Sequence, residues 1–169
     1  MKLSPLHDKD TEGGSQVSKV LSSLKVMQRM ERLATNVYKQ QIRAFKGNEI
    51  GDKLSKAHEN EKEHARTLAQ LITVMKGHPS RMGVFFGLAG GITGIATLLI
   101  GKTQLLKIDT WIERKAIEDY TKFINTIKYP EDTLGLLTRI IDDEKRHVNT
   151  WNTSIGILKG LDNTEEKSA

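Results

Sequence analysis

Apolar residues recur at helical spacing along most of the chain, and no stretch alternates apolar and polar residues as a half-buried strand does. The first helical pattern covers about residues 15–46, which contain no Pro or Gly, and stops at Gly47. The second covers about residues 52–76, with Asp52 as the expected N-cap and Gly77 directly after its end. Two long helices are therefore predicted in the first half of the chain.

The second half repeats this organisation. Helical spacing covers about residues 102–126 and then about residues 130–159, which Gly160 follows. Pro130 suits the first turn of the last helix, because the missing N–H of proline has no helical partner at that position. The expected fold class is all-α, an antiparallel four-helix bundle made of two helical hairpins.

The rest of the chain is divided among two tails and one connection. Residues 1–14 are polar and are expected to be a disordered N-terminal tail, residues 160–169 a flexible C-terminal tail, and residues 15–159 one bundle domain. Residues 83–101 carry no charge and include six Gly. This apolar, Gly-rich segment is long enough to span a bilayer, but a crossing would separate the two hairpins, so we expect a crossover connection.

Two sequence patterns each occur twice. Glu-Arg-x-Ala-x-x-x-Tyr begins at Glu31 and again at Glu113, 82 residues later. Glu-Lys-x-His-x-x-Thr begins at Glu61 and again at Glu144, 83 residues later. This nearly constant separation indicates two hairpins related by a pseudo-twofold axis.

The repeated residues place ionisable groups on faces that are otherwise apolar. In Glu-x-x-His the two side chains leave the same side of a helix, and no Lys or Arg shares these stripes. A buried carboxylate costs several kcal/mol unless a partner compensates its charge. Four glutamates and two histidines match two divalent cations bridged by carboxylates, an arrangement typical of di-iron and di-manganese proteins. The predicted metal ligands are Glu31, Glu61, His64, Glu113, Glu144 and His147. Two iron ions are the expected cofactor, with manganese as the alternative, and no organic cofactor is predicted.

Four further residues have two interpretations each. Asn60 and Asp143 directly precede the glutamates of the two Glu-x-x-His pairs, where they either orient a histidine or are ordinary polar neighbours. The second interpretation is favoured for Asn60. Tyr38 and Tyr120 lie two helical turns after the first-helix glutamates. Each either bonds a ligand carboxylate or carries an electron, or is a core aromatic with a satisfied hydroxyl group.

Composition excludes several other classes of site. The chain has no Cys, which excludes disulfides, thiolate zinc sites, iron–sulfur clusters and a rubredoxin module within it. The net charge of +5 is spread over interleaved basic and acidic residues, so nucleic acid is not an expected partner. The first ten residues have no apolar stretch of the kind that a signal peptide requires, so a cytoplasmic location is expected.

Residues 15–159 resemble the ferritin-like diiron carboxylate superfamily. Within it, the run GGITGIATLLIGKTQLLKIDTWIERKAIEDY is similar to the demethoxyubiquinone hydroxylase family. That resemblance implies a ferritin-like fold and a membrane-associated diiron monooxygenase, which hydroxylates a quinone precursor of ubiquinone with dioxygen and an external electron donor. The family's ligands fall on the same six residues. The chain departs from the family pattern at residues 27–31, MQRME in place of DHAGE, and at Asp119 in place of His.

The segment 83–101 and the reaction each leave alternatives open. The segment is expected either to contact the inner membrane peripherally and admit a hydrophobic substrate, or to pack against the bundle or a second subunit in a homodimer. The alternative functions are iron oxidation, iron storage or peroxide reduction, as in rubrerythrins and bacterioferritins. A further alternative is a non-enzymatic helical bundle that binds a membrane or a partner.

Overall fold

The computed structural model describes residues 9–80 and 100–165, and the side chains of residues 13–80 and 100–160. Almost all of the predicted crossover at 83–101 therefore lies outside the described residues, as do the outermost parts of both predicted tails.

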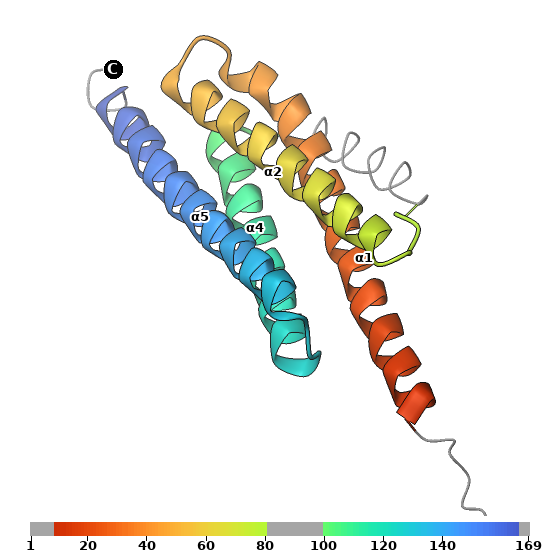
Figure 1. The fold of residues 1–169 in the computed structure, drawn as a ribbon. Coiled ribbons are helices and arrows are strands. Elements are labelled where there is room, and N and C mark those ends of the chain that lie inside the picture. Colours follow the sequence, from red (N-terminus) through yellow and green to blue (C-terminus); the bar gives the residue numbers. More distant parts are fainter. Residues whose placement is uncertain (1–8, 81–99, 166–169) are drawn as a thin grey trace, which may run out of the picture.

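Four long helices lie side by side as two antiparallel hairpins, α1 with α2 and α4 with α5 (Figure 1). The helices are α1 (Lys9–Gln41), α2 (Glu49–Val74), α4 (Lys102–Thr126) and α5 (Glu131–Glu165), with a short 3₁₀ helix η1 (Ile42–Phe45) after α1. Contacts of α1 with α4 and of α2 with α5 join the hairpins. The predicted all-α four-helix bundle is confirmed, and the bounds predicted for α4 match those observed.

The outer ends of the bundle are more helical than the sequence pattern predicts. Helix α1 begins at Lys9 and not near Ser15, and it continues through Gly13 and Gly14. A glycine inside a helix costs only about 1 kcal/mol relative to alanine, so two of them do not stop a helix that is packed along the rest of its length. For the same reason α5 continues past Gly160.

The turn between α1 and α2 depends on local backbone conformation. Gly47 has a φ of +84°, in the left-handed region that glycine adopts without strain. Asn48 caps α2 by accepting a hydrogen bond from the backbone N–H of Gly51 at 3.1 Å, so the prediction of Asp52 as N-cap was wrong. Asp52 lies in the first turn, where a negative charge suits the helix dipole. A Cβ atom on Gly51 would collide with the carbonyl oxygen of Phe45, which keeps this turn tight.

Pro130 lies one position earlier than predicted. It directly precedes α5, and its carbonyl oxygen accepts the first helical hydrogen bond, from the N–H of Leu134 at 2.9 Å. Pro130 therefore occupies the N-cap position, where its missing N–H again costs no helical bond.

The apolar core forms two clusters, one on each side of the bundle's middle. One lies toward the turn between α4 and α5 and includes Leu24, Leu68 and Leu137. The other lies toward η1 and includes Leu54 and Trp151. On α2 and α5 the Glu-x-x-His pairs lie between the parts of the helix that feed these two clusters. The clusters therefore close off both ends of the layer that contains the predicted ligands.

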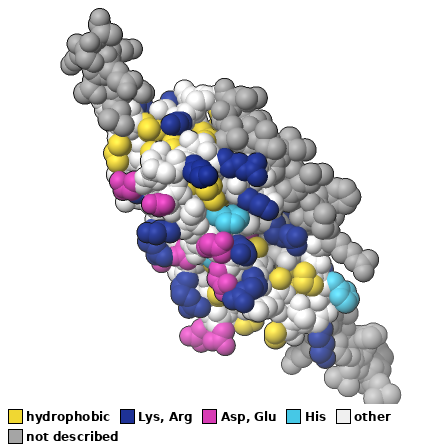
Figure 2. All heavy atoms as spheres, turned by 90° about the horizontal axis from the view of Figure 1, so that it is seen from above, with side chains coloured by type: hydrophobic (Ala, Val, Ile, Leu, Met, Phe, Trp, Pro, Cys, Tyr) yellow, Lys and Arg dark blue, Asp and Glu magenta, His cyan; other side chains and the backbone are white. Residues whose placement is uncertain are grey.

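The outer surface is mixed in charge. Basic and acidic side chains are interleaved on the face that Figure 2 displays and do not form a uniform basic patch. Among the helices that the structure describes, none combines the length and apolar character that crossing a bilayer requires.

Candidate metal centre

The six predicted ligand residues meet in the middle of the bundle, and each of the four long helices that the structure describes contributes at least one of them. The four glutamates are almost completely buried, with residue exposures of 0–2 %. The six residues form two overlapping groups, within each of which the candidate ligand atoms lie within 4.8 Å of one another. One group is Glu31, Glu61, His64 and Glu144, and the other is Glu61, Glu113, Glu144 and His147. Two glutamates are common to both groups, as carboxylates that bridge two ions must be.

Both histidines direct the same ring nitrogen toward the carboxylates. His64 Nδ1 lies 3.2 Å from Glu144 Oε1 and 3.6 Å from Glu31 Oε2. His147 Nδ1 lies 3.0 Å from Glu61 Oε1 and 3.2 Å from Glu144 Oε2. The i, i+3 spacing of Glu-x-x-His produces this arrangement, because it places both side chains on one helix face. Nδ1 is therefore the nitrogen of each histidine that faces the buried carboxylates.

Electrostatics around the cluster favour positive charge. Burial and the neighbouring Glu144 carboxylate together raise the pKa of Glu113 to about 8. Burial acts to raise the pKa of Glu144 as well, but the His147 and His64 imidazoles beside this carboxylate outweigh the effect and lower its pKa to about 2. Burial acts to lower the pKa of His64, but the neighbouring Glu144 and Glu31 carboxylates overcome that effect and raise it to about 9. Without metal ions, protons therefore supply the positive charge that the carboxylates require.

Three buried atoms of this cluster have no hydrogen-bond partner within the described part of the chain: Glu61 Oε1, His64 Nδ1 and Glu144 Oε1. Nδ1 of His64 lies within ion-pair distance of the Glu61 and Glu144 carboxylates, but these contacts do not have the geometry of hydrogen bonds. A buried polar atom left unpaired costs about 1–3 kcal/mol, and no Lys or Arg is buried among the described residues. The set of oxygen and imidazole ligands therefore fits two divalent ions of the iron or manganese type.

Both tyrosines bond a glutamate of the opposite hairpin. The Tyr38 hydroxyl on α1 donates to Glu113 Oε1 on α4, and the Tyr120 hydroxyl on α4 donates to Glu31 Oε1 on α1. In addition, Trp151 Nε1 donates to the Tyr38 hydroxyl oxygen at 3.1 Å. Both side chains also belong to the buried apolar clusters, so they are core aromatics whose hydroxyl groups are satisfied by these carboxylates, and a role at the metal centre stays a prediction.

Asp143 and Asn60 both lie beside the same histidine. Asp143 Oδ2 is 3.0 Å from His64 Nε2, and Asn60 Nδ2 is 3.1 Å from that nitrogen. Asp143 also forms an ion pair with the exposed Arg146. Within the described residues, no side chain or backbone group forms a hydrogen bond with Nε2 of His147.

The sequence interpretation missed one buried ionisable residue. Asp109 on α4 is fully buried, and its Oδ1 accepts a hydrogen bond from Gln41 Nε2 at 2.8 Å. Burial raises the pKa of Asp109 to about 7, although the Gln41 hydrogen bond acts in the opposite direction. Asp109 lies four residues before Glu113, so helical phase alone could have placed it on the core face. It belongs to neither of the two ligand groups.

A pocket of about 240 Å³ between α1 and α4 reaches three of the glutamates, Glu31, Glu61 and Glu113. Its walls are mostly apolar. They include Met30, Leu33, Ala34, Ile112 and Ala116. Trp111, which is 65 % exposed, and an ion pair between Lys115 and Asp119 at 2.8 Å complete the lining. An apolar molecule could therefore approach the carboxylates from this side.

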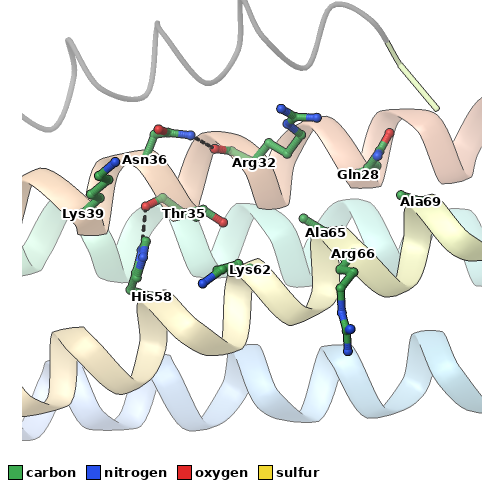
Figure 3. Close-up of a pocket in the computed structure, with 10 residues that line it drawn as sticks. All are labelled: Gln28, Arg32, Thr35, Asn36, Lys39, His58, Lys62, Ala65, Arg66 and Ala69. Atoms are coloured by element: carbon green, nitrogen blue, oxygen red, sulfur yellow. Dashed lines mark hydrogen bonds between the residues drawn. The ribbon is translucent and has the colours of Figure 1, made fainter.

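A second pocket, of about 460 Å³, lies between α1 and α2 and contains none of the six predicted ligands (Figure 3). Its lining is polar and basic. The side chain of His58 is held there by a 2.9 Å hydrogen bond with the carbonyl oxygen of Thr35. Figure 3 shows the guanidinium groups of Arg32 and Arg66 pointing to opposite sides, so they do not converge on one anion.

Comparison with known proteins gives consistent results. The family described as "Ubiquinone biosynthesis protein COQ7" matches residues 18–155. A Bos taurus protein named "NADPH-dependent 3-demethoxyubiquinone 3-hydroxylase, mitochondrial" is 24 % identical over 119 residues, covering 68 % of this chain and 55 % of that protein. Proteins of the same name from Caenorhabditis elegans and Homo sapiens are each 23 % identical, covering 69 % and 68 % of this chain and 65 % and 55 % of their own lengths. The chain thus matches between about half and two thirds of the length of these relatives.

Proposed function

This chain belongs to the COQ7 family of ubiquinone biosynthesis proteins, and on that premise we propose that it is a diiron hydroxylase of a demethoxyubiquinone-type quinone. The observation that carries the proposal is the meeting of four buried glutamates and two histidines in two overlapping groups. Family membership favours this reaction over the iron-storage, peroxide-reduction and non-enzymatic alternatives.

In the proposed centre each ion would have one glutamate and one histidine that the other ion does not share. Glu31 and His64 would hold one ion, Glu113 and His147 the other, while Glu61 and Glu144 would lie between the two. Two iron ions, when bound, supply the redox chemistry that activates dioxygen for hydroxylation. The chain itself orients and protects this centre. Tyrosine hydroxyls hold the carboxylates of Glu31 and Glu113 in position, and the apolar clusters on both sides exclude water.

The pocket between α1 and α4 supports an apolar substrate. Its walls are mostly apolar and its inner end is formed by three of the proposed ligands. Its volume of about 240 Å³ is smaller than that of pockets which enclose whole drug-sized ligands, roughly 300–1,000 Å³. We therefore infer that the quinone ring enters the pocket and that an apolar tail remains outside, along Trp111.

The exposed face at the start of α4 supports contact with a lipid surface. Ile100 is 45 % exposed and Trp111 65 % exposed, and together with Ile108 and Lys107 they line a shallow groove on this face. Trp and Lys are the residues that anchor proteins at membrane interfaces. Peripheral contact here would bring the lipid phase next to the mouth of the substrate pocket. The fluorescence of the exposed Trp111 should shift to the blue on addition of anionic vesicles, and an unchanged spectrum would contradict this contact.

The reaction needs an external electron donor. Hydroxylation by dioxygen places one oxygen atom in the substrate and reduces the other to water, which consumes two electrons and two protons beyond the substrate. The relatives are named NADPH-dependent, which supports a reduced nicotinamide as the source. The homodimer expected from the sequence stays a prediction.

The direct test is a defined reconstitution. The full chain is loaded with ferrous iron under anaerobic conditions, mixed with a short-tailed demethoxyubiquinone and NADPH, and exposed to air. Mass spectrometry should detect a product heavier by one oxygen atom, with that atom derived from labelled dioxygen. A matched Glu61→Gln variant should form none, because Glu61 belongs to both ligand groups. Wild-type protein that contains two irons and hydroxylates no quinone would contradict the proposal.

A further inference from the structure

The two histidines of the proposed centre differ in their surroundings, although the sequence repeat relates them by a pseudo-twofold axis. Both offer Nδ1 to the carboxylates, so the other ring nitrogen, Nε2, is free to bond a second group. What Nε2 contacts differs between the two hairpins.

His64 has a carboxylate partner from the opposite hairpin. Its Nε2 lies 3.0 Å from Oδ2 of Asp143 on α5, whose side chain is only 19 % exposed. The other carboxylate oxygen of Asp143, Oδ1, pairs with Arg146, so the carboxylate lies between this guanidinium group and the histidine. This is a carboxylate–histidine pair of the kind that orients metal-binding imidazoles.

His147 has no such partner. Within the part of the chain that the structure describes, nothing accepts a hydrogen bond from its Nε2, and its side chain is 12 % exposed against 6 % for His64. Its ring lies beside Trp151, with the ring centroids 6.5 Å apart. An indole ring provides a packing surface there but no charge.

The sequence repeat pairs Asp143 with Asn60, but Asn60 does not give His147 the contact that Asp143 gives His64. Asn60 lies 3.1 Å from Nε2 of His64, on its own helix, and not beside His147. With Nδ1 bound to a metal ion, Nε2 of His64 carries a single hydrogen, which Asp143 Oδ2 accepts, so the nitrogen of the Asn60 amide would then form no hydrogen bond with Nε2. An amide is neutral, and it therefore adds no charge to either half of the centre.

We propose that the two metal positions have unequal affinities, that the position at Glu31 and His64 binds more tightly, and that Asp143 causes the difference. The inference rests on the proposed function, because it takes the six residues as metal ligands. A carboxylate that accepts the N–H of a ligand histidine fixes the ring and raises the basicity of the nitrogen that binds the metal. Loss of such a partner typically weakens metal binding 10–100-fold.

The other contacts of the centre do not produce this difference. Glu31 and Glu113 each accept one tyrosine hydrogen bond, so these bonds are matched between the two positions. The glutamates common to both groups contribute to each position. Trp151 bonds Tyr38 and therefore reaches Glu113 only indirectly. Asp143 is the charged contact that one histidine has and the other lacks among the described residues.

The test compares single-position variants, because repulsion between two bound ions could by itself separate two binding events. Glu113→Ala retains the His64 position, and Glu31→Ala retains the His147 position. Each full-length variant is titrated with Mn²⁺ under anaerobic conditions, with calorimetry and the loss of the free-ion EPR signal as readouts. We expect the Glu113→Ala protein to bind Mn²⁺ at least tenfold more tightly than the Glu31→Ala protein does. Equal affinities, or the opposite order, would overturn the proposal.

The role of Asp143 is tested in the same background. Adding Asp143→Asn to Glu113→Ala should weaken Mn²⁺ binding about 10–100-fold, while adding it to Glu31→Ala should change the affinity less than threefold. The matched control is Asp142→Asn, the same change at an exposed neighbour paired with Lys145, which should affect neither protein. Equal weakening in both backgrounds would show a general structural effect and contradict the assigned role.

These outcomes separate the inference from the proposed function. Wild-type protein that binds two Mn²⁺ ions with the expected order, yet hydroxylates no quinone when loaded with iron, contradicts only the proposed reaction. Wild-type protein that binds no divalent ion contradicts both.

Discussion

The Tyr38 hydroxyl on α1 donates a hydrogen bond to the Glu113 carboxylate on α4, which joins the two hairpins at the layer of buried glutamates. The bond between Tyr120 and Glu31 repeats this relationship in the opposite direction. Because α1 and α4 belong to different hairpins, the two bonds couple the docking of the hairpins to the position of the carboxylates. The two tyrosines are not equivalent, however, since only the Tyr38 hydroxyl also accepts a bond from Trp151.

Removing the Tyr38 hydroxyl should cost more stability than removing that of Tyr120. Tyr38→Phe leaves two buried groups without this partner, the Glu113 carboxylate and the Trp151 N–H, whereas Tyr120→Phe leaves one. Each unpaired buried group costs about 1–3 kcal/mol, so the difference should be of that size. Urea denaturation of the metal-free proteins measures it. Equal losses would indicate that the indole bond contributes nothing.

Substitutions of the glutamates should remove different numbers of metal ions. Glu61 belongs to both ligand groups, so Glu61→Gln should reduce the bound divalent metal from two ions per chain toward none. Glu113 belongs to one group, so Glu113→Gln should retain one ion. Elemental analysis after gel filtration distinguishes these outcomes. Retention of two ions by the Glu61 variant would contradict its place between the metals.

The metal-free protein should lose stability as the pH rises from about 5 to 9. The folded pKa of Glu113, about 8, lies above its ordinary value of 4.5, so the folded state holds a proton that the unfolded state releases. His64 and His147 have folded pKa values of about 9, so their contribution is present below 6.5 and lost as the pH rises through 9. The lowered pKa of Glu144, about 2, acts in the opposite sense, but only below pH 4.5.

Urea denaturation at pH 5, 7 and 9 in the presence of a chelator tests this trend. Saturating Mn²⁺ should reverse it, because metal binding requires the deprotonated ligands and so strengthens as the pH rises. Metal-free protein that is more stable at pH 9 than at pH 5 would contradict the cluster's electrostatics.

Asp109→Asn should stabilise the metal-free protein in alkaline solution. The amide oxygen can still accept the Gln41 hydrogen bond, and the variant no longer has to ionise a buried carboxyl whose folded pKa is about 7. Each pKa unit corresponds to about 1.4 kcal/mol, so the variant's stability relative to wild type should rise by roughly 2–3 kcal/mol between pH 5 and pH 9. Asp142→Asn, at an exposed position, is the control and should show no such rise.

Filling the pocket between α1 and α4 should block the substrate and spare the metals. Ala116 lines this pocket, so Ala116→Leu should lower quinone hydroxylation at least tenfold while two ions remain bound. Ala65→Leu makes the same change in the other pocket, between α1 and α2, and should leave the activity near that of wild type. Product analysis with metal content measures both effects. Full activity of the Ala116 variant would show that the substrate uses another route.

The sequence by itself determined the four helices and the six residues that meet in the core. Apolar periodicity and helix-ending glycines are local signals, and Glu-x-x-His acts through i, i+3 geometry within one helix. The twofold repeat of these motifs indicated that two hairpins bring equivalent residues together. The predicted bounds of α4 are right, because Gly101 precedes the helix and the turn before Pro130 follows it. The predicted bounds are wrong at Gly14 and Gly160, where a glycine alone was taken as the end of a helix.

Only the tertiary structure decided which groups bond one another across the helices. Tyr38 and Glu113 lie 75 residues apart, and His64 and Asp143 lie 79 apart. Helical periodicity places a side chain on a face, but the rotation and the axial shift of the neighbouring helix decide which atom it meets. Those quantities result from packing of the whole core. The sequence repeat could therefore predict two similar half-sites. Only the packed bundle shows that Asp143 lies beside Nε2 of His64 and that, among the described residues, no carboxylate lies beside Nε2 of His147.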